Sequence, residues 1–225
     1  MPPTDEPAKR RVFLVDDHPL VREWLTTLIN QQSDLTVCGE AGDAPEALSA
    51  IGKLLPDAAV VDVTLANGSG IELIKDLRRR CPRLAIVVLS MHDESLYAER
   101  AMRAGARGYV TKRETTKKIV AAIRKVLEGG IYASEHFAAL MAEKLVDGRG
   151  GAESSPVAEL SDRELEVFKM LGSGQETRQI GESLGISMKT VQVYCARIKE
   201  KLGVKTMNEL LCEAVRWMAS QNSSV

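Results

Sequence analysis

The sequence has few of the features that mark secreted, membrane-spanning or disulfide-stabilised proteins. Its four cysteines, Cys38, Cys81, Cys195 and Cys212, show no paired spacing of the kind that ligates zinc, and they fit a reducing compartment. No apolar run approaches the roughly 20 residues that cross a bilayer. Residues 1–10 form a polar tail, which we expect to be disordered, and lack the apolar region of a signal peptide. We therefore expect a cytoplasmic protein that has no membrane partner.

Short apolar runs rich in β-branched residues, separated by segments of helix length, predict buried strands of a parallel α/β sheet. They span residues 12–15, 58–61, 85–89 and 108–110, and a further strand is expected around Cys38. Polar residues lie at or just past the ends of these runs: Asp16, Asp17, Asp62, Ser90 and Lys112. Because the ligand crevice of a doubly wound sheet lies outside the carboxyl ends of its strands, we expect one site to hold all five residues.

The five residues have the chemistry of a phosphoryl-transfer site. Converging carboxylates form a hard oxygen site suited to Mg²⁺. Beside the metal, a carboxylate can act as a nucleophile toward phosphorus, while a lysine ammonium and a hydroxyl contact the phosphoryl oxygens. Each residue taken singly also has a structural explanation, since Asp17 before His18-Pro19 is a reasonable helix start. We interpret His18 and His92 as polar loop or cap residues and assign neither to a metal.

The carboxyl-terminal part of the sequence predicts a small helical domain. Ser161 and Glu164 form a capping box before one helix, a short helix from 177 to 184 follows, and Gly185 is suited to a tight turn. Ser187 caps a longer helix that ends at Gly203. This succession is typical of a helix-turn-helix.

One face of the longer helix is apolar, with Val191, Cys195 and Ile198 at helical spacing, so these residues should face the core. Residues 187–205 carry five basic groups and one acidic group, although the whole chain has a net charge of −1. Such local concentration of positive charge suggests a polyanionic partner. The alternative is a solvated basic face in a helical bundle.

Between the two parts, residues 129–158 are interpreted as a linker that contains a helix over 134–146 and a flexible Gly/Ser stretch over 147–156. The apolar stripe of the last helix, about 206–219, is too wide for packing on one partner helix. We therefore expect it to pack partly on its own domain and partly on a second copy.

Residues 11–128 resemble the receiver domain of two-component response regulators, in which the phosphoacceptor, hydroxyl and lysine occur at similar intervals. The resemblance implies Asp62 as phosphoacceptor, Asp16, Asp17, Asp62 and Thr64 around Mg²⁺, Ser90 as switch hydroxyl, Tyr109 as coupled aromatic and Lys112 as phosphate contact. The family usually has proline four residues after the phosphoacceptor, where this chain has Ala66.

Residues 159–225 resemble the LuxR-type helix-turn-helix, and the whole chain is similar to the NarL/FixJ response regulators. The resemblance implies base contacts from Gln192, Val193 and Ala196, and phosphate contacts from Arg178, Lys189, Thr190, Arg197 and Lys201. It also implies double-stranded DNA and a sensor histidine kinase as partners, and a homodimer when active.

We expect a phosphorylation-gated transcription regulator rather than an enzyme. Two alternatives remain open: a regulator that binds DNA without phosphorylation, and a magnesium-dependent phosphohydrolase with Asp62 as nucleophile. The second lacks the acid two residues after the nucleophile that haloacid-dehalogenase-type phosphatases have, because Thr64 stands there.

Overall fold

The computed structural model describes residues 8–65, 68–91, 94–112, 116–146 and 156–222. These residues form two compact units, and the main division between them falls at Ala138/Ala139. Within the described ranges, no helix is long and apolar enough to cross a membrane.

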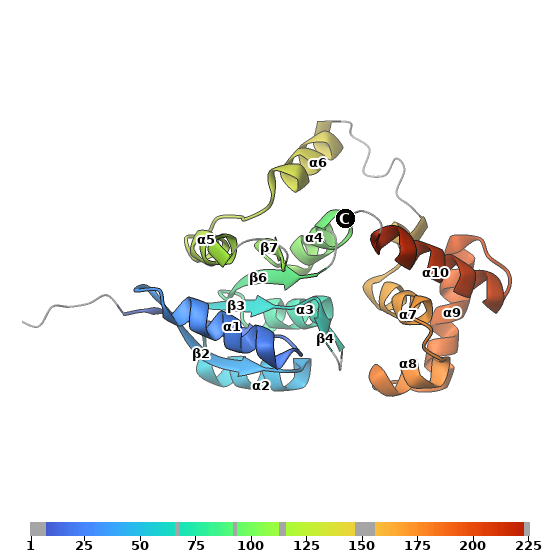
Figure 1. Ribbon diagram of the computed structural model, residues 1–225, viewed down its shortest axis with the longest axis horizontal. Helices are drawn as coiled ribbons and strands as arrows, with labels where there is room; N and C mark the ends of the chain where they lie inside the picture. The colour runs from blue at the N-terminus through green and yellow to red at the C-terminus, as the bar shows by residue number, and fades with distance from the viewer. Residues whose placement is uncertain (1–7, 66–67, 92–93, 113–115, 147–155, 223–225) are drawn as a thin grey trace, which may run out of the picture. The chain divides into compact units, whose positions relative to one another are not determined.

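The first unit contains a five-stranded sheet whose paired strands are all parallel, in the order β2-β1-β3-β6-β7 (Figure 1). The strands are β1 (Arg10–Val15), β2 (Leu35–Ala41), β3 (Ala58–Val61), β6 (Ala85–Ser90) and β7 (Gly108–Thr111). Two short strands, β4 (Thr64–Leu65) and β5 (Gly68–Ser69), pair separately after β3. The α/β fold with five parallel strands is confirmed, and every strand that was predicted from an apolar run is present.

Four helices connect these strands, a fifth follows β7, and together they cover both faces of the sheet. They are α1 (Pro19–Asn30), α2 (Ala44–Leu54), α3 (Gly70–Arg80), α4 (Glu94–Ala104) and α5 (Thr116–Leu127). Leu25 and Ile29 of α1 share one buried cluster with Ile119 and Ile123 of α5, so these two helices cover the same face. Helices α2, α3 and α4 pack side by side on the other face. Burial on both faces explains why the strands are continuously apolar.

The first unit continues ten residues beyond the boundary expected at residue 128. Gly129 ends the last turn after α5 with a φ of +84°. The chain then returns to the sheet edge, where the Tyr132 amide donates to the Arg107 carbonyl (2.9 Å) and the Tyr109 amide donates to the Tyr132 carbonyl (3.1 Å). Phe137, in helix α6 (Glu135–Val146), is also buried. Most of the Gly/Ser stretch expected to be flexible, 147–155, lies outside the described residues.

The second unit is helical, as expected. Over residues 156–222 it contains η1 (Pro156–Glu159), α7 (Asp162–Gly172), α8 (Thr177–Ser183), α9 (Met188–Leu202) and α10 (Met207–Asn222). The capping box of Ser161 and Glu164 is formed, and the Ser187 side chain caps α9 by accepting from the Thr190 amide. Gly185, in the turn between α8 and α9, has a φ of +63°, a conformation that favours glycine. The predicted helix-turn-helix is therefore present.

Helix α10 packs mainly on α7, with Leu210 and Ala214 fully buried. Phe168 and Trp217 extend this contact, with ring centroids 5.8 Å apart. Val215 on the same helix remains 52% exposed. Part of the wide apolar stripe is thus covered by its own unit, and pairing of the rest with a second copy stays a prediction.

Candidate functional site

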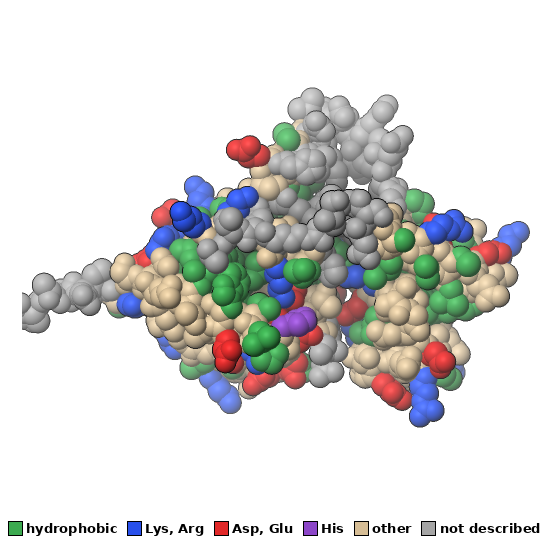
Figure 2. Space-filling view, in the orientation of Figure 1, with side chains coloured by type: hydrophobic (Ala, Val, Ile, Leu, Met, Phe, Trp, Pro, Cys, Tyr) green, Lys and Arg blue, Asp and Glu red, His purple; other side chains and the backbone are tan. Residues whose placement is uncertain are grey.

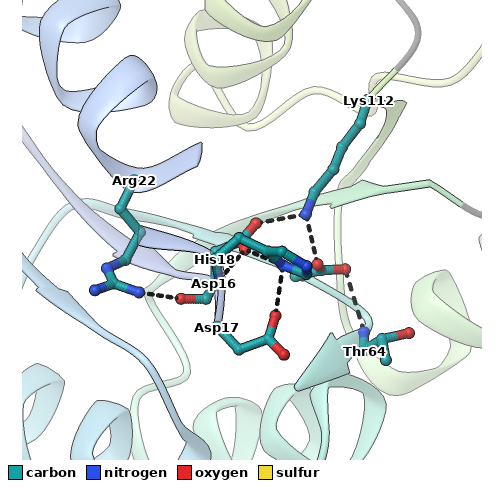
Figure 3. Close-up of polar contacts among 7 residues, drawn as sticks. Asp16, Asp17, His18, Arg22, Thr64 and Lys112 are labelled. Atoms are coloured by element: carbon teal, nitrogen blue, oxygen red, sulfur yellow. Dashed lines mark hydrogen bonds and ion pairs between the residues drawn. The ribbon is translucent and has the colours of Figure 1, made fainter. Parts of the chain in front are cut away.

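Three charged side chains from three different strand ends meet at one edge of the sheet (Figure 3). The ammonium of Lys112 lies 2.6 Å from Asp16 Oδ2 and 2.6 Å from Asp62 Oδ2. All three side chains are nearly inaccessible to solvent, with side-chain exposures of 9% or less. The expectation that residues 16, 62 and 112 converge is therefore met, although nearly fifty residues separate each from the next along the chain.

The parallel sheet produces this convergence through its register. The Asp16 amide donates to the Ala41 carbonyl and the Asp62 amide donates to the Val15 carbonyl, so both residues directly continue their strands. On the other side, the Lys112 amide donates to the Ser90 carbonyl at 2.7 Å. Ser90 is fully buried at the end of β6. Tyr109, the expected coupled aromatic, is also buried, in β7.

Burial dominates the electrostatics of this cluster. Burial raises the pKa of Asp62, and the hydrogen bond from Lys112 offsets only part of that rise, because the charge of Asp16 adds to it. Burial alone would lower the pKa of Lys112, but hydrogen bonds to Asp16 and Asp62 outweigh it, so that pKa is raised. The lysine stays charged at neutral pH and is shared by two carboxylates. Two carboxyl groups therefore share a single ammonium.

Asp17 and His18 complete the acidic cluster. His18 Nδ1 lies 2.8 Å from Asp17 Oδ1 and 3.1 Å from Asp16 Oδ1, and its side chain is 66% exposed. Figure 2 shows acidic side chains gathered around a histidine on the surface of the first unit. The sequence interpretation treated His18 as a cap residue; it does precede α1, but its side chain makes no cap hydrogen bond.

The donor set fits a hard divalent cation. Asp16, Asp17, His18 and Asp62 each offer one ligand atom, and these atoms lie within 4.8 Å of one another. Asp17 Oδ1 is buried and, apart from its contact with His18 Nδ1 at 2.8 Å, has no hydrogen-bond donor among the described residues. A buried carboxylate oxygen without a donor is costly unless a cation satisfies it. Three carboxylates at this spacing are the oxygen ligands that Mg²⁺ takes from proteins.

The segment after β3 orients the Asp62 carboxylate through a backbone hydrogen bond. The Thr64 amide donates to Asp62 Oδ1 at 3.2 Å, which leaves Oδ2 to Lys112. Gly70 approaches the same residue so closely that an added Cβ would lie 1.9 Å from the Asp62 carbonyl oxygen. Sequence analysis did not identify Gly70. Ala66, the position at which proline is usual, lies outside the described residues.

Arg22 is a second residue that sequence analysis missed. Its Nη1 donates to the Asp16 carbonyl at 2.7 Å (Figure 3). Its Nε lies 3.3 Å from Glu40 Oε1 in β2. Arg22 therefore ties the first turn of α1 to the backbone that carries Asp16 and Asp17. Its place one helical turn after His18-Pro19 was the only signal in the sequence, and a single arginine in that position is not specific.

In the second unit, α9 presents the two faces that its periodicity predicts. Val191, Cys195 and Ile198 are buried. Candidate DNA contacts are exposed on the other side: Lys189, Thr190, Gln192, Val193, Ala196 and Arg197. Thr190 is less available than expected, because its hydroxyl lies 2.8 Å from the Ser187 hydroxyl. Arg178 on α8 is 80% exposed and pairs with Glu182.

Lys201 is also exposed, but its ammonium is held by two other elements of the unit. Its ammonium lies 2.6 Å from Oε2 of Glu164, which is only 4% exposed in α7. The same ammonium donates to the Glu159 carbonyl at 3.1 Å. Helical periodicity could not predict this contact, because it joins residues 37 positions apart. We therefore omit Lys201 from the phosphate contacts proposed below.

The Glu164–Lys201 pair predicts that the second unit loses stability in acid. Burial would raise the pKa of Glu164, but hydrogen bonds from Lys201 and Ser161 lower it below its ordinary value of 4.5. The stabilisation is therefore complete above pH 4.5 and is lost as the pH falls through the lower folded-state pKa. Unfolding followed by Trp217 fluorescence, in a Trp24→Phe background, should show little change from pH 6 to pH 4.5 and a loss of stability below pH 4.5. Glu164→Gln should be less stable at pH 6 and lose less on acidification; parallel pH profiles would contradict the assignment.

Comparisons with known proteins agree with both units. Residues 12–124 match the model of the response regulator receiver domain, and residues 158–214 match that of the bacterial regulatory proteins of the luxR family. The transcriptional regulatory protein MctR of Rhizobium johnstonii is 35% identical over 92% of this chain and 93% of its own. The transcriptional activator DevR/DosR of Mycobacterium tuberculosis is 37% identical over 87% of this chain and 89% of its own.

A solved structure extends this similarity to the fold of the full chain. RcsB of Salmonella enterica, bound to the promoter P1flhDC in the presence of phosphomimetic BeF₃⁻, has a TM-score of 0.65 and 25% identity. The alignment covers 92% of this chain and 98% of RcsB. The chain belongs to the two-component response regulators that join a receiver domain to a LuxR-type DNA-binding domain, and it is a transcription regulator of that family.

Proposed function

We propose that Asp62 is the residue that accepts the phosphoryl group and that Lys112 holds the acceptor in place. The observation that carries this proposal is the position of the Lys112 ammonium, 2.6 Å from both Asp16 and Asp62. The acceptor forms a new P–O bond as the bond between phosphorus and the donor breaks. The histidine of a sensor kinase is the proposed donor, and its nitrogen takes back the bonding electron pair.

Each neighbour of Asp62 has a role in this transfer. Asp16, Asp17 and Asp62, with the Thr64 carbonyl, would hold Mg²⁺, which supplies positive charge that offsets the charge of the phosphoryl oxygens. The Thr64 amide orients one carboxylate oxygen of Asp62. Lys112 then moves its interaction from the carboxylate to the phosphoryl oxygens, and the Ser90 hydroxyl donates to the same group. Tyr109, the coupled aromatic, would change its position together with Ser90.

Phosphorylation adds about −1.5 to −2 charges at the sheet edge, enough to bias a two-state element. We propose that this change promotes homodimerisation and binding of α9 to double-stranded DNA in the cytoplasm. The N-terminal half of α9 would enter the major groove, where Gln192 can pair with adenine and Val193 can contact a thymine methyl group. Ala196 lies on the same exposed face, and Arg178, Lys189, Thr190 and Arg197 are the proposed phosphate contacts.

Mass spectrometry of the intact chain tests the acceptor function. Incubation with acetyl phosphate and Mg²⁺ should add one phosphoryl group per chain and then stop. A magnesium-dependent phosphohydrolase would instead release phosphate continuously from a generic phosphomonoester. Continuous turnover without accumulation of a phosphorylated chain would contradict the proposal.

Base reading by Gln192 gives a separate prediction. Gln192→Ala should cost about 1–3 kcal/mol of binding free energy on the preferred DNA sequence and relax selectivity at one base position. Affinity for mixed-sequence DNA and the salt dependence should stay nearly unchanged, because no phosphate contact is lost. Fluorescence anisotropy measures the affinity for each DNA and its salt dependence, with Glu200→Ala on the same helix as the control. Equal weakening on preferred and mixed DNA would show that Gln192 does not read a base.

A further inference from the structure

One side chain near the carboxyl-terminal end of α9 contacts two other elements of its unit. The Lys201 ammonium reaches Glu164 Oε2 in α7 at 2.6 Å and the Glu159 carbonyl oxygen in η1 at 3.1 Å. Three elements therefore meet at a single cation. Its side chain is 36% exposed, whereas the carboxylate that it contacts is 5% exposed. The contact lies at the edge of the unit, with Lys201 closing the solvent-facing side.

The buried carboxylate of Glu164 depends on the Lys201 ammonium to compensate its charge. The same Oε2 atom accepts the Ser161 amide at 2.7 Å, which closes the capping box at the start of α7. Removing one partner of a buried ion pair is strongly destabilising, since it leaves an uncompensated charge. If Lys201 turned outward to neutralise a DNA phosphate, it would leave Glu164 in that state. The geometry thus opposes the phosphate contact that the family pattern suggests.

We propose that Lys201 is a positioning residue for DNA recognition, which acts through Glu164 and η1 to fix the direction of α9. This inference rests on the proposed use of α9 in DNA binding. Lys201 lies nine positions after Gln192, which corresponds to about 14 Å along a helix that rises 1.5 Å per residue. A tilt of roughly 5° at the Lys201 end therefore displaces Gln192 by about 1 Å. Base-edge hydrogen bonds do not tolerate such a displacement, whereas contacts with flexible side chains at phosphates do.

Three variants of the full chain test the proposal: Lys201→Met, Arg197→Met and the double variant Lys201→Met/Glu164→Gln. Arg197 is the matched control, because it is a basic residue on the exposed face of the same helix. Binding is measured by anisotropy, with acetyl phosphate and Mg²⁺ present, over a range of salt concentrations. One probe is a mixed-sequence duplex of about 30 base pairs, and the other is a duplex of the same length that the wild-type chain selects from a random pool. This length exceeds the spacing of one helical turn between two half-sites of a dimer. Circular dichroism gives the folded fraction used to correct each affinity.

Arg197→Met should weaken both duplexes by a similar factor and lower the salt slope by about one unit. Lys201→Met should keep the wild-type slope and lose about ten-fold more affinity on the selected duplex than on the mixed one. The double variant should regain much of the lost stability, since Glu164→Gln removes the unpaired buried charge while it keeps an acceptor for Ser161. It should keep the selective loss on the selected duplex, because the contact from α9 to α7 and η1 is still absent.

The opposite pattern overturns the proposal: Lys201→Met lowers the slope by about one unit and weakens both duplexes equally. Full recovery of selective binding in the double variant also overturns it, because the unpaired charge of Glu164, and not the lost contact, would then explain the effect of Lys201→Met. If Lys201→Met does not fold, the double variant decides, since an unchanged slope supports positioning and a lower slope supports a phosphate contact. A wild-type chain that selects no duplex would overturn the proposed function instead, and this result is visible before any variant is compared.

Discussion

Asp62→Asn should abolish incorporation of phosphate from acetyl phosphate in the presence of Mg²⁺. The substitution keeps the shape of the side chain and can still accept from Thr64, but an amide is not a nucleophile toward phosphorus. Asp16 cannot replace it, because its backbone is fixed between Ala41 and Arg22 and its Oδ1 accepts the His18 amide at 2.9 Å. We therefore expect no phosphorylated chain in the intact-mass spectrum. Loss of the signal should be complete rather than partial.

Asp76→Asn is the control for this experiment. Asp76 belongs to α3 of the same unit, where it pairs with Arg79 at the surface. It should incorporate phosphate at the wild-type rate. Incorporation by Asp62→Asn at the wild-type level would show that another residue is the acceptor, and peptide mapping after borohydride trapping would then identify it.

Lys112→Met should destabilise the receiver unit and make its stability depend on Mg²⁺. Without the ammonium, the buried carboxylates of Asp16 and Asp62 lose their shared cation, which typically costs about 3 kcal/mol or more. Millimolar Mg²⁺ should restore much of this loss, because the metal ligands remain. Urea unfolding in EDTA and in Mg²⁺ measures both effects, and phosphorylation by acetyl phosphate should be impaired even when Mg²⁺ restores folding.

Lys117→Met, on the exposed side of α5, removes a lysine of the same unit and should unfold like the wild type in both buffers. The assignment of Lys112 fails if Lys112→Met is as stable as the wild type in EDTA. It also fails if Mg²⁺ stabilises the variant and the wild type equally.

Strand ends explain why much of the site could be predicted from sequence. Apolar runs that are buried on both faces identify the strands, and parallel strands bring the residues after Val15 and Val61 to one edge. The position of Asp62 beside Asp16 follows from that rule alone. The same holds for α9, where the 3.6-residue period separates Val191 and Ile198 from the exposed Gln192.

Contacts that depend on side-chain direction or on packing between distant segments could not be predicted in this way. Arg22 reaches the Asp16 backbone only because α1 leaves its strand at a particular angle. Gly70 is required by the approach of α3 to Asp62, which no local pattern encodes. Lys201 has the periodicity of a surface residue, and only the packing of α9 against α7 reveals its buried partner.

The central claim is that phosphorylation at Asp62 controls DNA binding, and a single titration tests it most directly. The full wild-type chain and Asp62→Asn are each titrated onto a duplex selected by the wild type, with and without acetyl phosphate and Mg²⁺, while light scattering reports the oligomeric state. The account predicts that acetyl phosphate increases DNA affinity and dimer formation of the wild type and changes neither for Asp62→Asn. An affinity of the wild type that is the same with and without the phosphodonor, while mass spectrometry shows full phosphorylation, would contradict it.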